Sequence, residues 1–232
     1  MGYLLNIVMI IGTVLLAIAL GDLIAIGPYK KVEPEKQSGE GEKSLPMGVE
    51  KVARIIRTQS FVEKQEGPSC GGFAAAYALR HFGVEAKGQD IYGEMFKIFK
   101  GNVHIREVKK ALKKRGIIST LCKGSIETLK EEIDKGYPVI LWVRSKPKSW
   151  DYHFFVAVGY DTEYNIYIAD SAYAPKTMKM DIFQGIPPYN RVIPKDYFLE
   201  IWDTACFFMP TYKNIYLIIR REGSEVLGEM AK

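Results

Sequence analysis

Residues 65–83 read QEGPSCGGFAAAYALRHFG. The alanine-rich half of this stretch has a high helix propensity, and Gly83 is a residue type that commonly follows the last turn of a helix. Ser69 is a residue type that is favoured at the N-cap position. The stretch therefore predicts a helix from Cys70 to Phe82 that begins at its cysteine.

A cysteine at the start of a helix has two interpretations. It can be a small buried residue, because unpaired cysteine is among the most buried residue types. It can also be a nucleophile, because the positive end of a helix and a nearby imidazolium both favour the reactive thiolate. The second interpretation requires a histidine close to the thiol and an acidic residue that orients this histidine.

His153 and Asp170 supply this pair in the later part of the chain. His153 begins the stretch HFFVAVGYD and Asp170 ends the stretch NIYIAD, and both stretches have the β-branched and aromatic composition of strands. If residues 161–164 form the turn of a hairpin, Tyr160 pairs with Asn165. His153 and Asp170 then lie on one face as diagonal neighbours, about 7–8 Å apart. A turn one residue longer or shorter would break this parity.

The tetrahedral intermediate of peptide hydrolysis carries an oxyanion, which needs hydrogen-bond donors. The backbone N–H of Cys70 at the start of the helix would supply one donor. An upstream amide side chain would supply another: Gln65, five residues before the cysteine, is the first candidate, and Gln59 is a weaker one. The candidate catalytic residues are therefore Cys70, His153, Asp170 and Gln65.

Further helices and strands follow from the hydrophobic periodicity. Apolar residues recur at helical spacing in residues 105–115, 125–135 and 195–203. The apolar runs VILWV, at residues 139–143, and IYLII, at residues 215–219, predict buried strands. Helices that come first, followed by an antiparallel sheet, are typical of an α+β fold.

The N-terminus has a different character. Residues 3–19, YLLNIVMIIGTVLLAIA, carry no charge, and the apolar sequence resumes with LIAIG shortly afterwards. About 20 apolar residues suffice to cross a bilayer, so residues 1–27 are expected to be a transmembrane anchor. A cleavable signal peptide is the alternative, because residues 17–19 (AIA) resemble a cleavage site, although no Lys or Arg precedes the apolar stretch.

The segment after the apolar stretch indicates the domain organisation. Residues 28–48 are rich in Gly, Pro, Ser, Glu and Lys and predict a flexible linker, which leaves residues 49–222 as one domain and residues 223–232 as a tail. Lys30 and Lys31, directly after the span, favour a cytoplasmic position for the C-terminal domain through the positive-inside rule. Cleavage of the N-terminal segment would instead lead to secretion.

Composition argues against several other classes of function. The formal net charge of the 232 residues is +5, and the lysines are spread over expected helix faces and linkers, so no nucleic-acid partner is expected. The three histidines and the three cysteines (Cys70, Cys122 and Cys206) show no zinc-ligand spacing, so neither a metal nor an organic cofactor is expected. Cys122 and Cys206 are expected to be buried apolar residues, or a disulfide if the domain is exported.

Four stretches together resemble a known family. The nucleophile segment, the stretches YHFFVAVGYD and IYIADSAY, and the later stretch IPKDYFLEIWD are similar to papain-like cysteine peptidases. More narrowly, they resemble the bacteriocin-processing, double-glycine-leader peptidase family and its stand-alone relatives. The resemblance covers residues 60–205. Two positions depart from the family pattern: the interval from Gln65 to Cys70 is five residues where the family usually has six, and Ser171 stands where the family tends to have proline.

The resemblance implies a papain-like fold in which an N-terminal helical part carries Cys70 and an antiparallel sheet carries His153 and Asp170. It implies a cysteine peptidase in which Cys70 attacks a peptide carbonyl and His153 transfers the proton. Together with the expected N-terminal anchor, this predicts a membrane-anchored enzyme. Asp170 would orient the imidazole, and Gln65 would help to bind the oxyanion. The implied substrate is an exported peptide or precursor that is cut after small residues.

Two alternatives remain open at this stage. The same three side chains would serve a peptidoglycan amidase or an acyltransferase of papain-like fold, because both reactions pass through an acyl group on the thiol. A non-catalytic module that binds a leader peptide is the alternative that is not an enzyme.

Overall fold

The computed structural model describes residues 6–13, 16, 29–34, 53–173, 188–205 and 212–223. The strands within these residues are β1 (Lys30–Lys31), β2 (Arg54–Ile55), β3 (Ile117–Lys123), β4 (Val139–Arg144), β5 (Tyr152–Tyr160), β6 (Ile166–Ala169), β7 (Arg191–Ile193) and β8 (Ile215–Arg221). The helices that accompany these strands are α2 (Cys70–His81), α3 (Gly88–Glu94), α4 (Ile105–Lys113), α5 (Ile126–Asp134) and α6 (Lys195–Trp202). Two short 3₁₀ turns are η1 (Phe99–Gly101) and η2 (Ser171–Tyr173).

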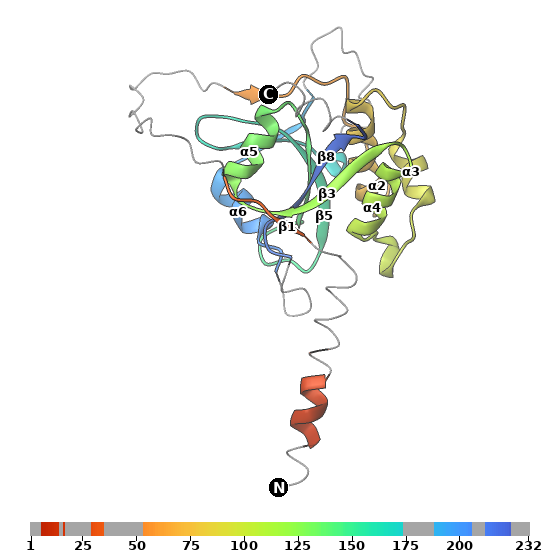
Figure 1. Cartoon of the computed structure of the whole chain (residues 1–232), viewed down its shortest axis with the longest axis vertical. Coiled ribbons are helices and arrows are strands. Elements are labelled where there is room, and N and C mark those ends of the chain that lie inside the picture. Colours follow the sequence, from red (N-terminus) through yellow and green to blue (C-terminus); the bar gives the residue numbers. More distant parts are fainter. Residues whose placement is uncertain are drawn as a thin grey trace.

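The strands form one sheet. Its order is β1-β3-β8-β4-β5-β6-β7, and the short β2 pairs with β5 beside this path. Every pairing is antiparallel except that of β1 with β3. Figure 1 shows that α2, α3 and α4 gather on one side of the curved sheet, whereas α5 and α6 lie toward the other. This arrangement confirms the α+β class expected from the sequence.

The helices predicted from periodicity are present with small differences at their ends. Each ends one or two residues before the predicted end: α2 at His81, α4 at Lys113, α5 at Asp134 and α6 at Trp202. The predicted strands correspond to β4, β5, β6 and β8.

Several elements have no counterpart in the sequence predictions, namely α3, β3 and the short strands β1, β2 and β7. β1 lies inside the stretch expected to be a flexible linker. Tyr29 and Val32, on either side of it, pack against the core, and the Val32 N–H donates to the Lys123 carbonyl at 2.9 Å. The expected linker is therefore ordered at its start.

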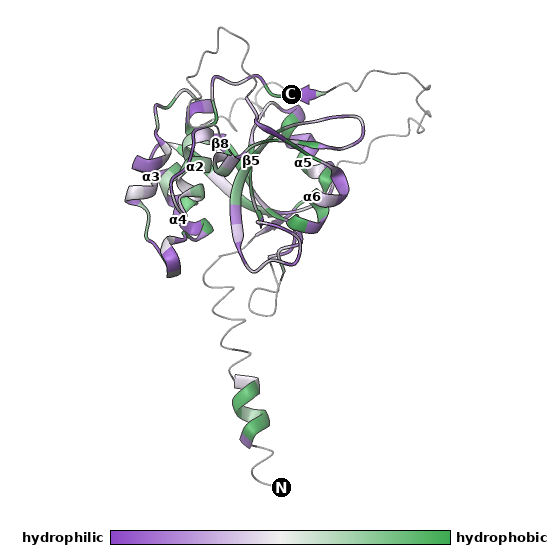
Figure 2. Cartoon of the chain, turned by 180° about the vertical axis from the view of Figure 1, so that it is seen from behind, coloured by the Kyte–Doolittle hydropathy of each residue, from purple (hydrophilic) through white to green (hydrophobic). Residues whose placement is uncertain are grey.

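α2 is buried in the core. Its residues from Cys70 to Arg80 are buried without exception. Figure 2 shows hydrophobic residues along the strands of the sheet and hydrophilic residues on the outer parts of the helices. A Cβ atom at Gly72 would lie 2.6 Å from the Gly88 carbonyl oxygen, closer than real Cβ contacts come. The glycine after Cys-Gly therefore allows α3 to approach the first turn of α2.

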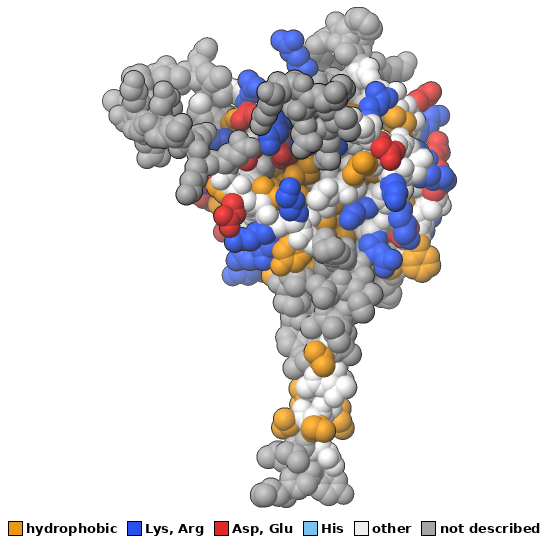
Figure 3. Space-filling model, viewed as in Figure 1, with side chains coloured by type: hydrophobic (Ala, Val, Ile, Leu, Met, Phe, Trp, Pro, Cys, Tyr) orange, Lys and Arg blue, Asp and Glu red, His pale blue; other side chains and the backbone are white. Residues whose placement is uncertain are grey.

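Residues 6–13 of the expected anchor are helical, and their apolar side chains are exposed, as Figure 3 shows for the narrow end of the molecule. Within the part of the chain that the structure describes, no helix has the length and apolar character needed to cross a membrane. The other residues of the expected anchor lie outside the described residues, except residue 16. Residues 35–52, Cys206 and residues 224–232 also lie outside them.

Candidate active site

The turn of the hairpin between β5 and β6 differs from the prediction. Tyr160 pairs with Ile166 and not with Asn165, so the turn is one residue longer than expected. The carboxylate of Asp161 stabilises this longer turn, because it accepts the backbone N–H groups of Glu163 and Asn165 at 3.0 and 2.9 Å. The predicted pairing of Tyr160 with Asn165 is therefore wrong.

A β-bulge cancels this difference before β5 reaches His153. The register shifts next to Gly159, and Val156 then pairs with Ala169, as the predicted register requires. A bulge inserts one extra residue into one strand and so restores the parity that the longer turn had broken. His153 and Asp170 therefore lie on the same face of the sheet, as expected.

His153 and Asp170 are in direct contact. Nε2 of His153 lies 2.7 Å from Oδ1 of Asp170, and the Asp170 side chain is fully buried. Oδ1 also accepts the backbone N–H of Ala172 at 3.0 Å, while Oδ2 accepts Nη1 of Arg191 at 2.5 Å. The amide side chain of Asn190 bonds to both the N–H and the carbonyl of Asp170, at 2.8 and 2.9 Å. The carboxylate is thus held on both oxygens and on its backbone.

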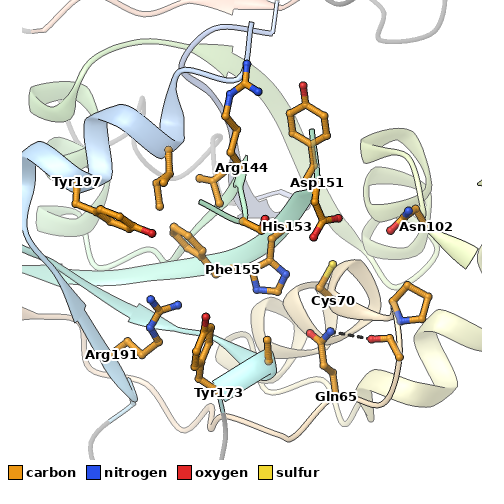
Figure 4. A pocket seen from close by; sticks show the side chains of 17 residues that line it. Gln65, Cys70, Asn102, Arg144, Asp151, His153, Phe155, Tyr173, Arg191 and Tyr197 are labelled. Carbon is orange, nitrogen blue, oxygen red and sulfur yellow. Dashed lines mark hydrogen bonds between the residues drawn. The ribbon is translucent and has the colours of Figure 1, made fainter. Parts of the chain in front are cut away.

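Cys70 is the first residue of α2, and only 7% of it is exposed. Its side chain lies close enough to His153 to raise the pKa of that imidazole. Figure 4 shows its sulfur atom next to the imidazole of His153. Because Asp170 occupies Nε2 of the imidazole, Nδ1 is the ring nitrogen that faces the thiol.

The start of α2 differs from the expected capping. Ser69 occupies the N-cap position, but its side chain does not cap the helix. Its hydroxyl donates to the Glu66 carbonyl at 2.7 Å, and its carbonyl accepts the N–H of Gly72 at 2.9 Å. The N–H of Cys70 has no acceptor among the residues that the structure describes, so it is free to bind an oxyanion.

The surroundings of His153 favour its charged form. Burial alone would disfavour an imidazolium, but the hydrogen bond to Asp170 and the nearby Asp170 and Cys70 groups outweigh burial and raise the pKa of His153 to about 10. Burial likewise acts against the Asp170 carboxylate, yet His153 and Arg191 hold the pKa of that carboxyl below its usual value. In contrast, burial raises the pKa of the Cys122 thiol to about 11.

Gln65 lies in the same cavity as Cys70. Its Nε2 donates to the Gly67 carbonyl at 2.8 Å, which is the dashed line in Figure 4. Its Oε1 accepts the hydroxyl of Ser171 at 2.6 Å. An amide nitrogen carries two hydrogens, so the second N–H of Gln65 can serve an oxyanion.

Gln59, the weaker candidate, lies at the opposite end of α2. Its Nε2 donates to the Arg80 carbonyl at 3.3 Å. At a rise of 1.5 Å per residue, Arg80 is about 15 Å from Cys70 along the helix. Gln59 is therefore too far away to contact a substrate at the thiol.

Buried polar contacts fix the segment that carries Gln65 against α2. The hydroxyl of Ser60 donates to the Tyr77 carbonyl at 2.8 Å, and Arg80 forms an ion pair with Glu63 at 2.5 Å. The Arg80 side chain is only 8% exposed, so breaking this pair would leave a buried charge. These contacts hold the segment that leads to Gln65 against the last turns of α2.

Two cavities meet at Cys70. The larger has a volume of about 290 Å³ and extends from the thiol past His153 to Arg191. The smaller has a volume of about 180 Å³ and is lined largely by apolar side chains, including Trp142 and Trp150. The thiol therefore belongs to the lining of both cavities.

The sequence predictions missed three residues of the site. Asn190 and Arg191 contact Asp170 although they follow it by 20 and 21 residues. The contact arises from the pairing of β6 with β7, and β7 is too short to leave a pattern in the sequence. Ser171 contacts Gln65, and its departure from the proline of the family was the signal that could have identified it.

Comparison with known proteins places the chain in a family. Residues 56–203, well over half of the chain, match the family described as the Peptidase_C39 like family. Among solved structures, the peptidase domain of Streptococcus ComA, a bi-functional ABC transporter involved in a quorum sensing pathway, is similar to this chain. It is 20% identical with a TM-score of 0.50, and the match covers 70% of this chain and 98% of that one.

A second similar structure is a double glycine motif protease from an AMS/PCAT transporter in complex with the leader peptide. It is 19% identical with a TM-score of 0.49, and the match covers 75% of this chain and 99% of that one. No curated protein matches the sequence. The likeness to the ComA domain supports the fold, and the match over residues 56–203 shows the family. The chain belongs to the Peptidase_C39 like family and is a cysteine peptidase.

Proposed function

We propose that this peptidase hydrolyses peptide bonds through a triad of Cys70, His153 and Asp170. The observation that carries the proposal is the position of His153, which contacts Asp170 through Nε2 and has the sulfur of Cys70 next to its ring (Figure 4). A nucleophile, a base and an acidic group that orients the base, in this order, are what covalent catalysis by a thiol requires.

The first half of the reaction forms a thioester. The thiolate of Cys70 attacks the carbonyl carbon of the scissile bond, and the electron pair of the C=O bond moves onto the oxygen. The side-chain N–H of Gln65 and the backbone N–H of Cys70 stabilise this oxyanion. As the C–N bond breaks, His153 donates its Nδ1 proton to the leaving amine.

The second half of the reaction restores the enzyme. His153, now neutral, takes a proton from a water molecule at Nδ1, and the resulting hydroxide attacks the thioester on Cys70. Collapse of the second tetrahedral intermediate releases the acid product and returns the thiolate and imidazolium. Asp170 accepts the hydrogen bond from Nε2 throughout and keeps the imidazole in the orientation that both steps need.

The proposed substrate is an exported peptide or precursor that binds in an extended form across Cys70. The two cavities that share Cys70 in their lining support an extended substrate. The resemblance to leader-processing peptidases supports an exported one. A peptidoglycan amidase or acyltransferase would form the same thioester and would differ in the acyl group or acceptor, whereas the family match and the His153–Asp170 contact disfavour a module that only binds.

The test uses the full-length protein and a chemical probe, because labelling by the probe can be measured without a known substrate. An acyloxymethyl ketone, which reacts irreversibly with thiol peptidases, should label the protein at Cys70. Cys70→Ser and His153→Ala should each abolish labelling and should lower peptide turnover by a factor on the order of 10⁴. Cys122→Ser is the matched control and should be labelled normally. Turnover retained in folded Cys70→Ser protein would refute the proposal.

We also propose that residues 1–27 anchor the enzyme in a membrane as a single span. The uncharged stretch of residues 3–19 and the helical, exposed apolar residues 6–13 support this proposal. Because β1 begins at Lys30, the folded domain would start almost directly after the span. The full-length protein should sediment with membranes and resist carbonate extraction, whereas the variant lacking residues 1–27 should be soluble and active. An insoluble or unfolded truncated protein would contradict the anchor, and a reporter fused after Lys232 would show the side of the membrane.

A further inference from the structure

Arg191 extends the row of interacting side chains beyond the three proposed catalytic residues. We propose that Arg191 is a positioning residue, which keeps Asp170 ionised and oriented and thereby supports the reactive state of Cys70 and His153. The inference rests on the proposed triad and adds a fourth member to it. Nothing in the sequence pattern identifies Arg191, because it lies on the short strand β7, far along the chain from Asp170.

The geometry of the contact is that of a buried ion pair. Nη1 of Arg191 lies 2.5 Å from Oδ2 of Asp170, whose side chain is fully buried, while 29% of the Arg191 side chain is exposed. The Arg191 guanidinium also lies over the ring of Tyr173, 3.9 Å from its centroid. The ion pair and the aromatic contact together leave the guanidinium little rotational freedom.

The two oxygens of Asp170 are divided between different partners. Oδ2 takes Arg191, and Oδ1 takes His153 together with the backbone N–H of Ala172. This division fixes the rotation of the carboxylate so that Oδ1 faces Nε2 of the imidazole. Without Arg191, Oδ2 would have no hydrogen-bond donor among the residues that the structure describes.

Cys70, His153, Asp170 and Arg191 form one cluster of ionisable side chains, and their charges alternate in sign. In the reactive state the order is thiolate on Cys70, imidazolium on His153, carboxylate on Asp170 and guanidinium on Arg191, with a net charge of zero. Removal of Arg191 would leave a net charge of −1 in a buried place, where uncompensated charge is strongly disfavoured. The cluster would relieve this charge by binding a proton, which removes the thiolate or the carboxylate.

Other charged groups near the cluster do not replace Arg191. Lys64 donates to the Ala172 carbonyl at 2.5 Å and not to Asp170. Arg144 and Asp151 line the same cavity. The Arg144 guanidinium is bound by the carbonyls of Asp203, Ser149 and Ala205. Apart from the imidazolium of His153, Arg191 is thus the cation in contact with the Asp170 carboxylate within the described part of the chain.

The test measures the rate at which iodoacetamide alkylates Cys70 in the full-length protein as a function of pH, by mass spectrometry of the Cys70 peptide. Iodoacetamide reacts with the thiolate and not with the thiol. The pH at which the rate is half-maximal (the midpoint) therefore reports the pH at which the cluster binds a proton. In Arg191→Met the midpoint should rise by about one unit, which makes alkylation about tenfold slower below the midpoint. Arg191→Lys keeps the charge, so its midpoint should stay within about half a unit of the wild type.

Arg220→Met is the matched control, because Arg220 forms a comparable buried ion pair with Glu132 away from the cavity. It should lower the melting temperature and leave the Cys70 midpoint unchanged. A merely structural role of Arg191 would give the same pattern: a lower melting temperature and an unchanged midpoint. If Arg191→Met fails to fold, Arg191→Gln, which keeps a hydrogen-bond donor without the charge, should show the same upward shift.

Two outcomes separate this inference from the proposed function. If Cys70 of the wild type is alkylated no faster than the buried Cys122, the triad itself is refuted. If the wild type shows fast alkylation of Cys70 and folded Arg191→Met or Arg191→Gln keeps the wild-type midpoint, the triad stands and the role of Arg191 is refuted.

Discussion

Replacing Asp170 by asparagine exchanges one carboxylate oxygen for an amide nitrogen and removes one negative charge, with almost no change in volume. The new side chain can still contact Nε2 of His153, so the geometry of the contact can survive. The variant therefore separates the effect of the charge from the effect of shape. Its consequence for His153 can be worked out from the structure.

Two unit charges 2.7 Å apart, the distance between Nε2 of His153 and Oδ1 of Asp170, attract each other by about 6 kcal/mol at an effective dielectric constant of 20. This energy corresponds to about 4 pKa units. Asp170 is therefore a major cause of the raised pKa of His153, which lies at about 10 despite the opposing effect of burial. In Asp170→Asn this attraction is lost while burial remains, so the pKa of His153 should fall by several units.

The expected result for Asp170→Asn is a loss of the imidazolium at neutral pH and a fall in kcat by a factor on the order of 10⁴. The loss of imidazolium is visible in the proton NMR titration of the His153 ring, and the loss of rate is visible with a peptide substrate cut after small residues. Asp161→Asn is the matched control, since Asp161 is a buried carboxylate at the other end of the same hairpin. An unchanged His153 titration in folded Asp170→Asn protein would refute the electrostatic argument.

Three further predictions concern the oxyanion, the packing and the stability of the site. Gln65→Ala should lower kcat by about 10²–10³ in steady-state kinetics, whereas Gln59→Ala should leave kcat within about twofold of the wild type. In urea unfolding, Gly72→Ala should lose about 1–3 kcal/mol, because its Cβ would lie 2.6 Å from a backbone oxygen of α3, whereas Gly93→Ala, with free space around it, should lose nothing. The raised pKa of His153 means that its contribution to the free energy of unfolding is full below pH 6.5 and is lost as the pH rises through about 10. A free energy of unfolding that is flat over this range, or that depends on pH equally in His153→Ala, would contradict the last prediction.

The sequence predicts the helices in which apolar residues recur over two turns or more. It also predicts the strands that consist of an apolar run. The predicted helices were found because their apolar residues recur every three or four positions. The short strands β1, β2 and β7 have two or three residues each, and no periodicity exists over so short a stretch. They become strands only because a longer neighbouring strand offers free N–H and carbonyl groups along its edge.

The residues of the site that could be predicted are likewise those whose signal lies in the nearby sequence. Cys70 could be identified because its environment, a helix start after Gly-Pro-Ser, is local. His153 and Asp170 could be identified as a pair because a hairpin places them on a shared face. The predicted turn was one residue too short, and a bulge between Ala157 and Gly159 restored the parity. Arg191 could not be identified, because its contact with Asp170 depends on which strand pairs with β6.

The two positions at which the chain departs from the family pattern contact each other, which suggests that they compensate. The interval between Gln65 and Cys70 is one residue shorter than usual, and a shorter interval would displace or rotate the carboxamide. Ser171, in the place of the usual proline, donates its hydroxyl to Oε1 of Gln65 at 2.6 Å and accepts the Gln65 backbone N–H on its carbonyl at 3.1 Å. Proline has no hydroxyl and could not bind Oε1. Because Ser171 binds the oxygen end of the carboxamide, the nitrogen end is left to face the cavity at Cys70, where an oxyanion needs a donor. The serine thus provides a physical reason why Gln65 can serve the site despite its unusual spacing.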